Sequence, residues 1–359
     1  MRILVLGGGA QGRVISADLA RSLPAATVTV LDVTRPALVA LPNLSWLEGD
    51  ASDPEAVAGR LREHDIGVGA LPSRFGFGAM RAAIEARRTL VDVSFTAEDP
   101  LELETDARAA GITIAPDCGL APGLSNLILG EAVRAHGTPR SATIMVGGVA
   151  EDPARPFGYV VTWSIDDLME EYTRPARIVR AGREVEVPVF SGLERVEVTG
   201  VGTMEAFYSD GLRTLIQTLP GVREMGEMTL RWPGHVAAIQ PLLRAGTLRD
   251  TLRERCTLDP PRDLVALVVR IDYHDRRDEI TMVDRYDPTT GMTAMSRTTA
   301  LTTSVVAQLA AAGGLGDPGV RPLERVAEDE RACSFVLDEM GARGVRFTRQ
   351  TLGLGPGAR

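Results

Sequence analysis

The order of apolar and polar positions divides the chain into an alternating first third and a strand-rich remainder. Over residues 1–115, short apolar runs typical of strands alternate with stretches of helical spacing. The apolar runs lie at residues 1–6, 27–31, 44–47, 66–71, 89–94 and 111–115. Strands and helices that alternate in this way predict one twisted, parallel sheet, as in a doubly wound α/β domain.

The rest of the chain shows more strands than helices. Strand-like runs lie at residues 142–149, 157–163, 176–180, 184–189, 263–273, 279–286 and 292–297. A turn at residues 287–291 joins the last two, so we expect an antiparallel or mixed sheet in an α+β domain. Residues 298–312 form an apolar helical stretch that is expected to return to the first domain.

These patterns predict three segments. Residues 1–118 form a dinucleotide-binding domain, and residues 119–297 form an α+β domain for the substrate and the subunit contact. Residues 116–123, rich in proline and glycine, serve as the hinge. Residues 298–359 supply C-terminal helices that return toward the first domain and a glycine-rich tail that frays from Gly353.

The first apolar run ends in a glycine-rich turn. Gly7, Gly9 and Gly12 follow the run, and a helical pattern begins at Ala10 and Gln11. In dinucleotide-binding loops, the first glycine allows a tight turn, the second admits the pyrophosphate, and the third lets helix and strand pack closely. The N–H groups of the helix's first turn then bind the phosphates. The strand before and the helix after favour this interpretation over a chance glycine-rich turn.

Asp32 ends the second apolar run, where an acidic residue accepts hydrogen bonds from the adenosine ribose. A carboxylate there repels the 2′-phosphate of NADP, so we expect NAD as the cofactor. Arg35 lies three residues on and would relieve that repulsion, which keeps NADP as the alternative. Asp50 follows the third run and is expected either near the adenine or in a solvated turn.

The fourth and fifth apolar runs end in further candidate residues. Ligands of doubly wound sheets bind beyond the carboxyl ends of the strands. The loop that begins at Leu71 and Pro72 is therefore expected near the phosphates or the nicotinamide ribose, and Ser94 ends the next strand. Asp92 lies at the same edge, as a candidate catalytic residue or as a cap of the following helix.

Composition excludes several classes of protein. The 359 residues allow two domains, and 44% apolar content is ordinary for a globular protein. The net charge of −9 argues against non-specific nucleic-acid binding, and no apolar run is long enough to span a membrane. The four histidines are scattered, so no metal site is expected. Three widely spaced cysteines and the absence of a signal-peptide pattern predict a cytoplasmic protein with reduced thiols.

The chain contains no lysine, since all 39 of its basic side chains are arginine. Composition bias of the genome explains this absence most simply. Its chemical consequence is that this chain supplies no lysine Schiff base, no lysine general base and no phosphate-binding lysine.

Several stretches resemble a known family. The N-terminal glycine turn and residues 117–126 are similar to the saccharopine dehydrogenase superfamily. The stretches at residues 162–164, 171–175, 205–214, 229–235 and 293–299 resemble its lysine 6-dehydrogenase branch. Trp232 departs from that branch, where tyrosine is expected, but both residues are aromatic. The missing lysine argues against the lysine–histidine acid–base pair described for fungal-type saccharopine dehydrogenases.

The resemblance extends from residue 1 to about residue 325. It implies an N-terminal Rossmann domain and a C-terminal substrate domain that also carries the contact of a homodimer or larger homo-oligomer. The implied activity is NAD-dependent oxidation of the ε-amine of L-lysine. The product would be the 6-semialdehyde, which cyclises to 1-piperideine-6-carboxylate, with release of ammonia.

This chemistry requires groups that move a proton and groups that bind an amino acid. His235 is the candidate acid–base group, because it is the one histidine within a family stretch; a structural histidine is the alternative. Arg213 and Arg297 are candidates to bind the α-carboxylate. Tyr172, together with Asp167 and Glu171, is a candidate to recognise the amine, although the acidic stretch also suits a solvated helix face.

Two other functions stay open. One is a saccharopine-type or carboxyalkyl-amine dehydrogenase, whose larger pocket would accept an adduct of two amino acids. The other is a dinucleotide sensor without catalytic activity, against which the full-length second domain argues.

Overall fold

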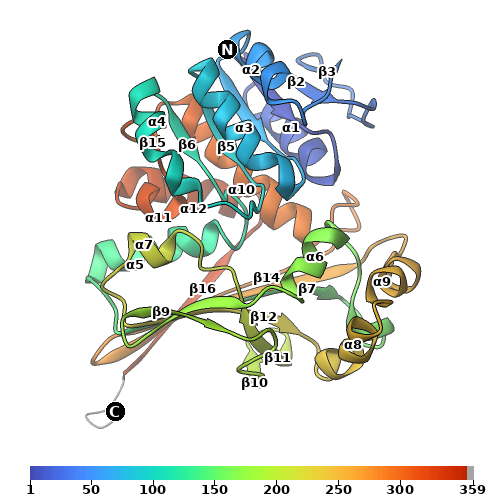
Figure 1. The fold of residues 1–359 in the computed structure, drawn as a ribbon, viewed down its shortest axis with the longest axis vertical. Coiled ribbons are helices and arrows are strands. Elements are labelled where there is room, and N and C mark those ends of the chain that lie inside the picture. The colour runs from blue at the N-terminus through green and yellow to red at the C-terminus, as the bar shows by residue number, and fades with distance from the viewer. Residues whose placement is uncertain (354–359) are drawn as a thin grey trace. The chain divides into compact units, whose positions relative to one another are not determined.

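A computed structural model of the chain describes residues 1–353, which form two compact units. The first unit comprises residues 1–131 and 298–344, and the second comprises residues 132–297 and the chain from residue 345 onward. Figure 1 shows the elements of each unit. The frayed tail expected from Gly353 onward lies, from residue 354, outside the described residues.

The first unit contains a seven-stranded parallel sheet, in the order β15-β6-β5-β4-β1-β2-β3. The strands are β1 (Arg2–Leu6), β2 (Thr27–Asp32), β3 (Leu44–Glu48), β4 (Ile66–Gly69), β5 (Thr89–Asp92), β6 (Thr113–Ala115) and β15 (Gly319–Val320). The helices are α1 (Ala10–Ser22), α2 (Pro54–Arg62), α3 (Ser73–Ala86), η1 (Pro100–Leu103), α4 (Glu104–Ala110), α5 (Leu124–His136), α10 (Ala294–Ala311), α11 (Leu323–Val326) and α12 (Glu330–Ala342). This order is that of a Rossmann fold with one added strand, as expected.

Alternate strand residues of this sheet pack against different helices. Leu4 and Leu6 of β1 join buried side chains of α2, α3 and α4 in one core. α1 is held elsewhere, through Asp18, whose carboxylate accepts hydrogen bonds from Ser304 of α10 and from Arg343 at the end of α12. The returning helices α10 and α12 therefore pack against the first helix of the dinucleotide-binding fold.

The second unit contains a nine-stranded mixed sheet, with the main order β10-β11-β12-β7-β13-β14-β16 and the β8–β9 hairpin attached to β12. The strands are β7 (Ser141–Ala150), β8 (Ala176–Arg180), β9 (Arg183–Val187), β10 (Glu194–Val198), β11 (Gly202–Ser209), β12 (Glu224–Arg231), β13 (Asp263–Asp272), β14 (Arg276–Arg285) and β16 (Phe347–Gly353). The helices are η2 (Pro156–Gly158), α6 (Ile165–Glu171), α7 (Leu215–Thr218), α8 (His235–Arg244) and α9 (Leu248–Cys256).

This second sheet curls on itself. The turn between β10 and β11 reaches β14, where the Arg285 side chain donates a hydrogen bond to the Gly200 carbonyl. The side chains inside the curl form one apolar core, while a second core joins Phe207 of β11 to α6, α8 and α9. The mixed α+β architecture expected for this part of the chain is confirmed.

Three local expectations are wrong. Residues 292–297 were expected as a strand, but α10 begins at Ala294, because the Asp263 carboxylate accepts hydrogen bonds from the N–H groups of Ala294 and Met295. Residues 157–163 form no strand, since the chain turns at Phe157, whose φ is +57°. Residues 347–353 were placed with the returning helices, but they form β16, which pairs with β14.

Candidate functional site

The glycine turn of the first unit forms an open anion-binding site. Gly7 has a φ of +96°, and a Cβ at Gly12 would lie 1.9 Å from the Gly7 carbonyl oxygen, so the turn and the start of α1 are in close contact. A Cβ at Gly9 would meet nothing within 4 Å. Gly9 and Ala10 are exposed, and no side chain caps the first turn of α1. Its N–H groups are therefore available to a phosphate.

Two polar side chains lie at this turn as the sequence predicted. The Asp32 carboxylate, at the end of β2, accepts hydrogen bonds from the Gly8 N–H at 2.7 Å and from the Thr34 N–H at 2.9 Å. Gln11, in the first turn of α1, buries an Oε1 atom that has no hydrogen-bond partner among the described residues. The open turn and the unpartnered amide oxygen fit a dinucleotide, whose phosphates and hydroxyls supply the missing partners.

The remaining expected cofactor residues lie along the same sheet edge. Asp50 follows β3 and is exposed, and hydrogen bonds from the Ser52 hydroxyl and then from the Ser52 N–H lower the pKa of its carboxyl. Pro72 is the N-cap residue just before α3, and the preceding Leu71 carbonyl accepts a hydrogen bond from the Ser94 hydroxyl at 3.1 Å. Ser94 therefore links the loop after β5 to the loop after β4.

Asp92, the last residue of β5, is completely buried beside this link. Its Oδ1 accepts a hydrogen bond from the Ser94 N–H at 2.7 Å, while its Oδ2 has no partner among the described residues. Burial, with the nearby Asp117 as a lesser cause, raises the pKa of Asp92 to about 7. Asp92 does not cap a helix, since it lies in a strand and contacts the loop that follows.

The second unit brings three of its candidate residues, Tyr172, His235 and Glu171, together in a polar cluster. The Tyr172 hydroxyl lies 2.9 Å from His235 Nε2 and accepts a hydrogen bond from Arg231 Nε at 2.9 Å. Arg231 also donates to Glu171 Oε1 at 2.8 Å. Tyr172, His235 and Arg231 are each at most 2% exposed. We call these four residues the Tyr172 cluster.

Hydrogen-bond complementarity fixes the protonation of this cluster. The other ring nitrogen of His235, Nδ1, lies 2.8 Å from the Phe157 carbonyl, which only accepts, so Nδ1 carries the proton. Nε2 then accepts the hydrogen bond from Tyr172. Burial, and secondarily the Arg231 guanidinium, lower the pKa of His235 to about 3. Both nitrogens of a neutral His235 are therefore satisfied.

Glu171 is the solvent-facing member of the Tyr172 cluster. Its side chain is 19% exposed, and its Oε1 is held by Arg231 and by the Thr229 hydroxyl. No described residue donates a hydrogen bond to Oε2. Sequence reasoning missed Arg231 and Thr229. Both lie in the stretch of residues 229–235 that contains His235, and this position was the signal that could have identified them.

The candidate arginine Arg297 is paired with carboxylates outside the Tyr172 cluster. Arg297 is paired within the second unit with Asp284 at 3.0 Å and with Asp287 at 3.7 Å. Arg213 follows β11, is 5% exposed and has a φ of +52°. Asp167 lies in the first turn of α6, where its N–H bonds to the Ser164 hydroxyl.

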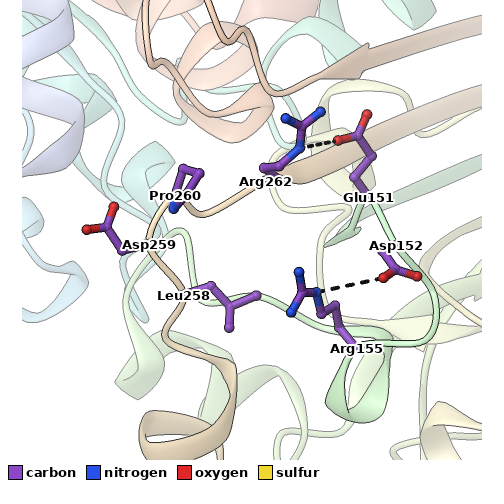
Figure 2. A pocket seen from close by; sticks show the side chains of 7 residues that line it. All are labelled: Glu151, Asp152, Arg155, Leu258, Asp259, Pro260 and Arg262. Carbon is purple, nitrogen blue, oxygen red and sulfur yellow. Dashed lines mark hydrogen bonds and ion pairs between the residues drawn. The ribbon is translucent and has the colours of Figure 1, made fainter.

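The second unit also has a hollow of about 350 Å³, drawn in Figure 2. Its two arginines already face carboxylates: Arg262 lies 2.9 Å from Glu151, and Arg155 lies 3.8 Å from Asp152. Both guanidinium side chains are about half exposed. None of the residues predicted from sequence lines this hollow, and its paired charges leave it without a clear ligand chemistry.

Membrane-spanning helices and metal-binding clusters are both absent from the described part of the chain. No helix within residues 1–353 is long and apolar enough to cross a bilayer. No group of three or more histidine, cysteine, aspartate or glutamate side chains there is arranged to hold a metal ion.

Comparison with family profiles covers nearly the whole chain. Residues 3–115 match the profile described as "Saccharopine dehydrogenase NADP binding domain", and residues 119–345 match that described as "Saccharopine dehydrogenase C-terminal domain". The first profile therefore points to a nicotinamide dinucleotide as the ligand of the glycine turn.

Curated relatives carry the same family name. "Saccharopine dehydrogenase [NADP(+), L-glutamate-forming]" of Schizosaccharomyces pombe is 24% identical over 258 residues, which are 68% of this chain and 57% of the relative. The protein of that name from Saccharomyces cerevisiae is 26% identical over 216 residues, which are 57% of this chain and 48% of the relative. The chain thus spans about half the length of these relatives.

A solved structure shares the fold. The apo, histidine-tagged saccharopine dehydrogenase (L-Glu forming) from Saccharomyces cerevisiae aligns with a TM-score of 0.76 at 17% identity. The alignment covers 98% of this chain and 99% of the other. At this identity the likeness shows the fold alone.

Proposed function

Because the chain belongs to the saccharopine dehydrogenase family, we propose that it is a pyridine-dinucleotide-dependent oxidoreductase that oxidises the ε-carbon–nitrogen bond of L-lysine. The observation that carries the redox half of this proposal is the open glycine turn, with Gly9 facing free space and α1 uncapped. The dinucleotide supplies the hydride acceptor. This chain's residues hold its phosphates and ribose.

We propose NAD as the cofactor, with NADP as the alternative. NAD is supported by Asp32, whose carboxylate is held at the end of β2 by Gly8 and Thr34 and would repel a 2′-phosphate. NADP is supported by the names of the relatives and by Arg35, whose guanidinium lies 5.9 Å from the Trp46 ring centroid, near the adenine side of the sheet. Replacing Asp32→Ser should weaken NAD binding and improve NADP binding; unchanged affinities would remove Asp32 from the ribose site.

The substrate amine must lose a proton before hydride can leave its carbon, because the nitrogen lone pair drives that step. Near neutral pH this deprotonation costs roughly 4–5 kcal/mol for an amine of pKa ~10.4. We propose that Glu171 binds an ammonium group of the substrate through Oε2, since Arg231 and Thr229 already hold Oε1. His235, with both nitrogens paired, would position Tyr172 and Arg231 instead of moving the proton itself.

A second candidate substrate is saccharopine, which is favoured by the names of the curated relatives. Saccharopine carries carboxylates beyond those of lysine, and Arg213 and Arg297 are the arginines that the sequence offered for such groups. The absence of lysine from this chain argues for an acid–base arrangement different from a lysine–histidine pair.

The experiment mixes the purified protein with saturating NAD and either L-lysine or saccharopine at mildly alkaline pH, and follows NADH absorbance. The proposal predicts NADH formation and ammonia release with lysine. Turnover with saccharopine but not with lysine would make saccharopine the proposed substrate. Tight NADH binding without turnover of either amine would favour the dinucleotide sensor.

Glu171→Gln should raise the KM for the amine more than it lowers kcat. The control is Glu170→Gln, at a neighbouring, half-exposed side chain paired with Arg174, which should change neither constant.

A further inference from the structure

Asp92 is the buried titratable group of the first unit that the proposed binding site leaves unexplained. Register places it beside the glycine turn: Leu6 at the end of β1 pairs with Gly69 of β4, and Gly69 pairs with Asp92 of β5. These three residues end neighbouring strands at the edge where doubly wound sheets bind their ligands.

The position of the carboxyl depends on Gly69. A Cβ at Gly69 would lie 1.7 Å from Asp92 Oδ2, so the carboxyl occupies the space that a side chain on β4 would need. Ser94 is packed just as closely, because a Cβ at Gly76 in α3 would lie 2.5 Å from Ser94 Cβ. Asp92 and Ser94 therefore fill the space between the ends of β4 and β5 and the start of α3.

We propose that Asp92 is a positioning residue for the dinucleotide site, and that its neutral carboxyl holds together the loops that follow β4 and β5. This inference rests on the proposed binding of a dinucleotide at the glycine turn. The connection runs from Asp92 Oδ1 to the Ser94 N–H, and from the Ser94 hydroxyl to the Leu71 carbonyl. Asp92 acts through these groups and touches no reacting atom.

The surroundings of the Asp92 carboxyl favour its neutral, protonated form. A buried carboxylate needs several donors, but the donors near Asp92 both belong to Ser94, and its Oδ2 has no partner among the described residues. The titratable groups that face it are Asp117 and Cys118, from the loop after β6. β4 faces it with Gly69, which carries no charge, and Gly76 of α3 faces Ser94 instead. Among the described residues, no cationic side chain contributes to the pKa of Asp92, so no opposite charge balances its carboxylate.

Ionisation should therefore loosen the two loops. The pKa of Asp92 lies at about 7, so the carboxyl changes its charge within the range in which cofactor binding is easily measured. The Ser94 hydroxyl lies within hydrogen-bond reach of the Asp92 carboxyl, and a carboxylate is a stronger acceptor than the Leu71 carbonyl, so ionisation would draw the hydroxyl away from Leu71 and break the link. For one coupled proton, the Kd of the cofactor rises by up to tenfold per pH unit above that pKa.

The test titrates the wild-type protein and Asp92→Asn with NADH between pH 6 and 8.5. NADH is the appropriate probe because its pyrophosphate does not titrate in this range, whereas a phosphomonoester such as that of NADPH titrates near pH 6. We expect the wild-type Kd to rise several-fold toward high pH and the Kd of the asparagine variant to stay flat. Ser94→Ala, which keeps the carboxyl but cuts the link to Leu71, should bind more weakly at every pH.

A second measurement needs no variant. Calorimetric titration of the wild-type protein with NADH in two buffers of different ionisation enthalpy counts the protons taken up, and we expect up to one proton per NADH at pH 7.5. A flat wild-type Kd with no proton uptake overturns the role of Asp92 and leaves the proposed function standing. No NADH binding at any pH overturns the proposed function itself, so the two failures are distinguishable.

Discussion

Two regions of the molecule, the glycine-turn edge of the first unit and the Tyr172 cluster of the second, arrange their polar groups in opposite ways. The first presents open backbone N–H groups at the edge of a parallel sheet and buries Asp92 behind them with one oxygen unpartnered. The second encloses Tyr172, His235 and Arg231 in a cluster where each hydrogen-bonding group of Tyr172 and His235 meets a partner, and only Glu171 faces solvent. At these two places, the unpartnered oxygens of Gln11 and Asp92 lie where a cofactor is expected, and the paired groups of the Tyr172 cluster form a framework behind a single carboxylate.

The largest expected effect is an opposite response of the two buried groups to pH. The pKa of Asp92 rises from 3.8 to about 7 on folding, so its contribution to stability is present below pH 4 and is lost as pH rises to about 7. The pKa of His235 falls from 6.5 to about 3, so its contribution is present above pH 6.5 and is lost as pH falls toward 3. Each change amounts to at most about 4–5 kcal/mol.

Differences in the free energy of unfolding between variant and wild type, plotted against pH, separate the contribution of Asp92 from that of His235. The free energy of unfolding of Asp92→Asn minus that of the wild type should rise between pH 4 and 7, and the same difference for His235→Asn should fall between pH 3 and 6.5. Subtraction removes other groups such as Asp263, whose pKa burial raises to about 6. If both differences rise with pH, or both fall, the contrast between buried Asp92 and buried His235 is wrong.

The second-largest expected effect is the loss of stability when the Arg231 guanidinium is removed from the Tyr172 cluster. Arg231→Leu should reduce the stability of the second unit by about 3 kcal/mol, because it leaves Tyr172 without the Nε donor and Glu171 without its arginine partner. Urea unfolding followed by tryptophan fluorescence measures this. Arg262→Leu, which removes a half-exposed pair with Glu151, is the control and should cost less than about 1 kcal/mol.

A smaller effect separates binding from folding at the glycine turn. Gly9→Ala places a methyl group in open space, so the melting temperature should stay within about one degree of the wild type, while the Kd for NADH rises at least about tenfold, or about 1.4 kcal/mol. Gly12→Ala, whose Cβ would collide with the Gly7 carbonyl, should lower both stability and affinity. If Gly9→Ala binds NADH normally, the pyrophosphate does not cross this turn.

The smallest effect tests whether the Tyr172 cluster is a framework. Tyr172→Phe removes one hydroxyl from between His235 and Arg231 and should cost about 1–2 kcal/mol of stability. NADH affinity, a property of the first unit, should not change. A loss of NADH affinity without a loss of stability would contradict the assignment of Tyr172 to the framework.

The first unit was predictable because its expected binding site is formed by the backbone of the glycine turn. Gly7, Gly9 and Gly12 specify the turn through their spacing alone, and apolar runs separated by helical patterns specify the parallel sheet. The isolation of Asp92 Oδ2 was not predictable, since it depends on which neighbours a folded carboxyl meets. From the sequence, Asp92 was only one acidic residue at the end of a strand.

The second unit was less predictable because its contacts join distant residues. Glu171 and Arg231 meet across 60 positions, and Asp263 starts α10 from 31 residues away, which turned an expected strand into a helix. β10 was missed because its residues 194–198, Glu-Arg-Val-Glu-Val, carry charges typical of an exposed edge. The roles expected for Arg213, Arg297 and His235 in catalysis stay predictions.

The account depends most on the binding of a pyridine dinucleotide by this chain, which calorimetric titration of the wild-type protein with NADH, and separately with NADPH, measures directly. We predict saturable binding with one site per chain and a lower Kd for NADH than for NADPH. Failure of both nucleotides to bind would contradict the account.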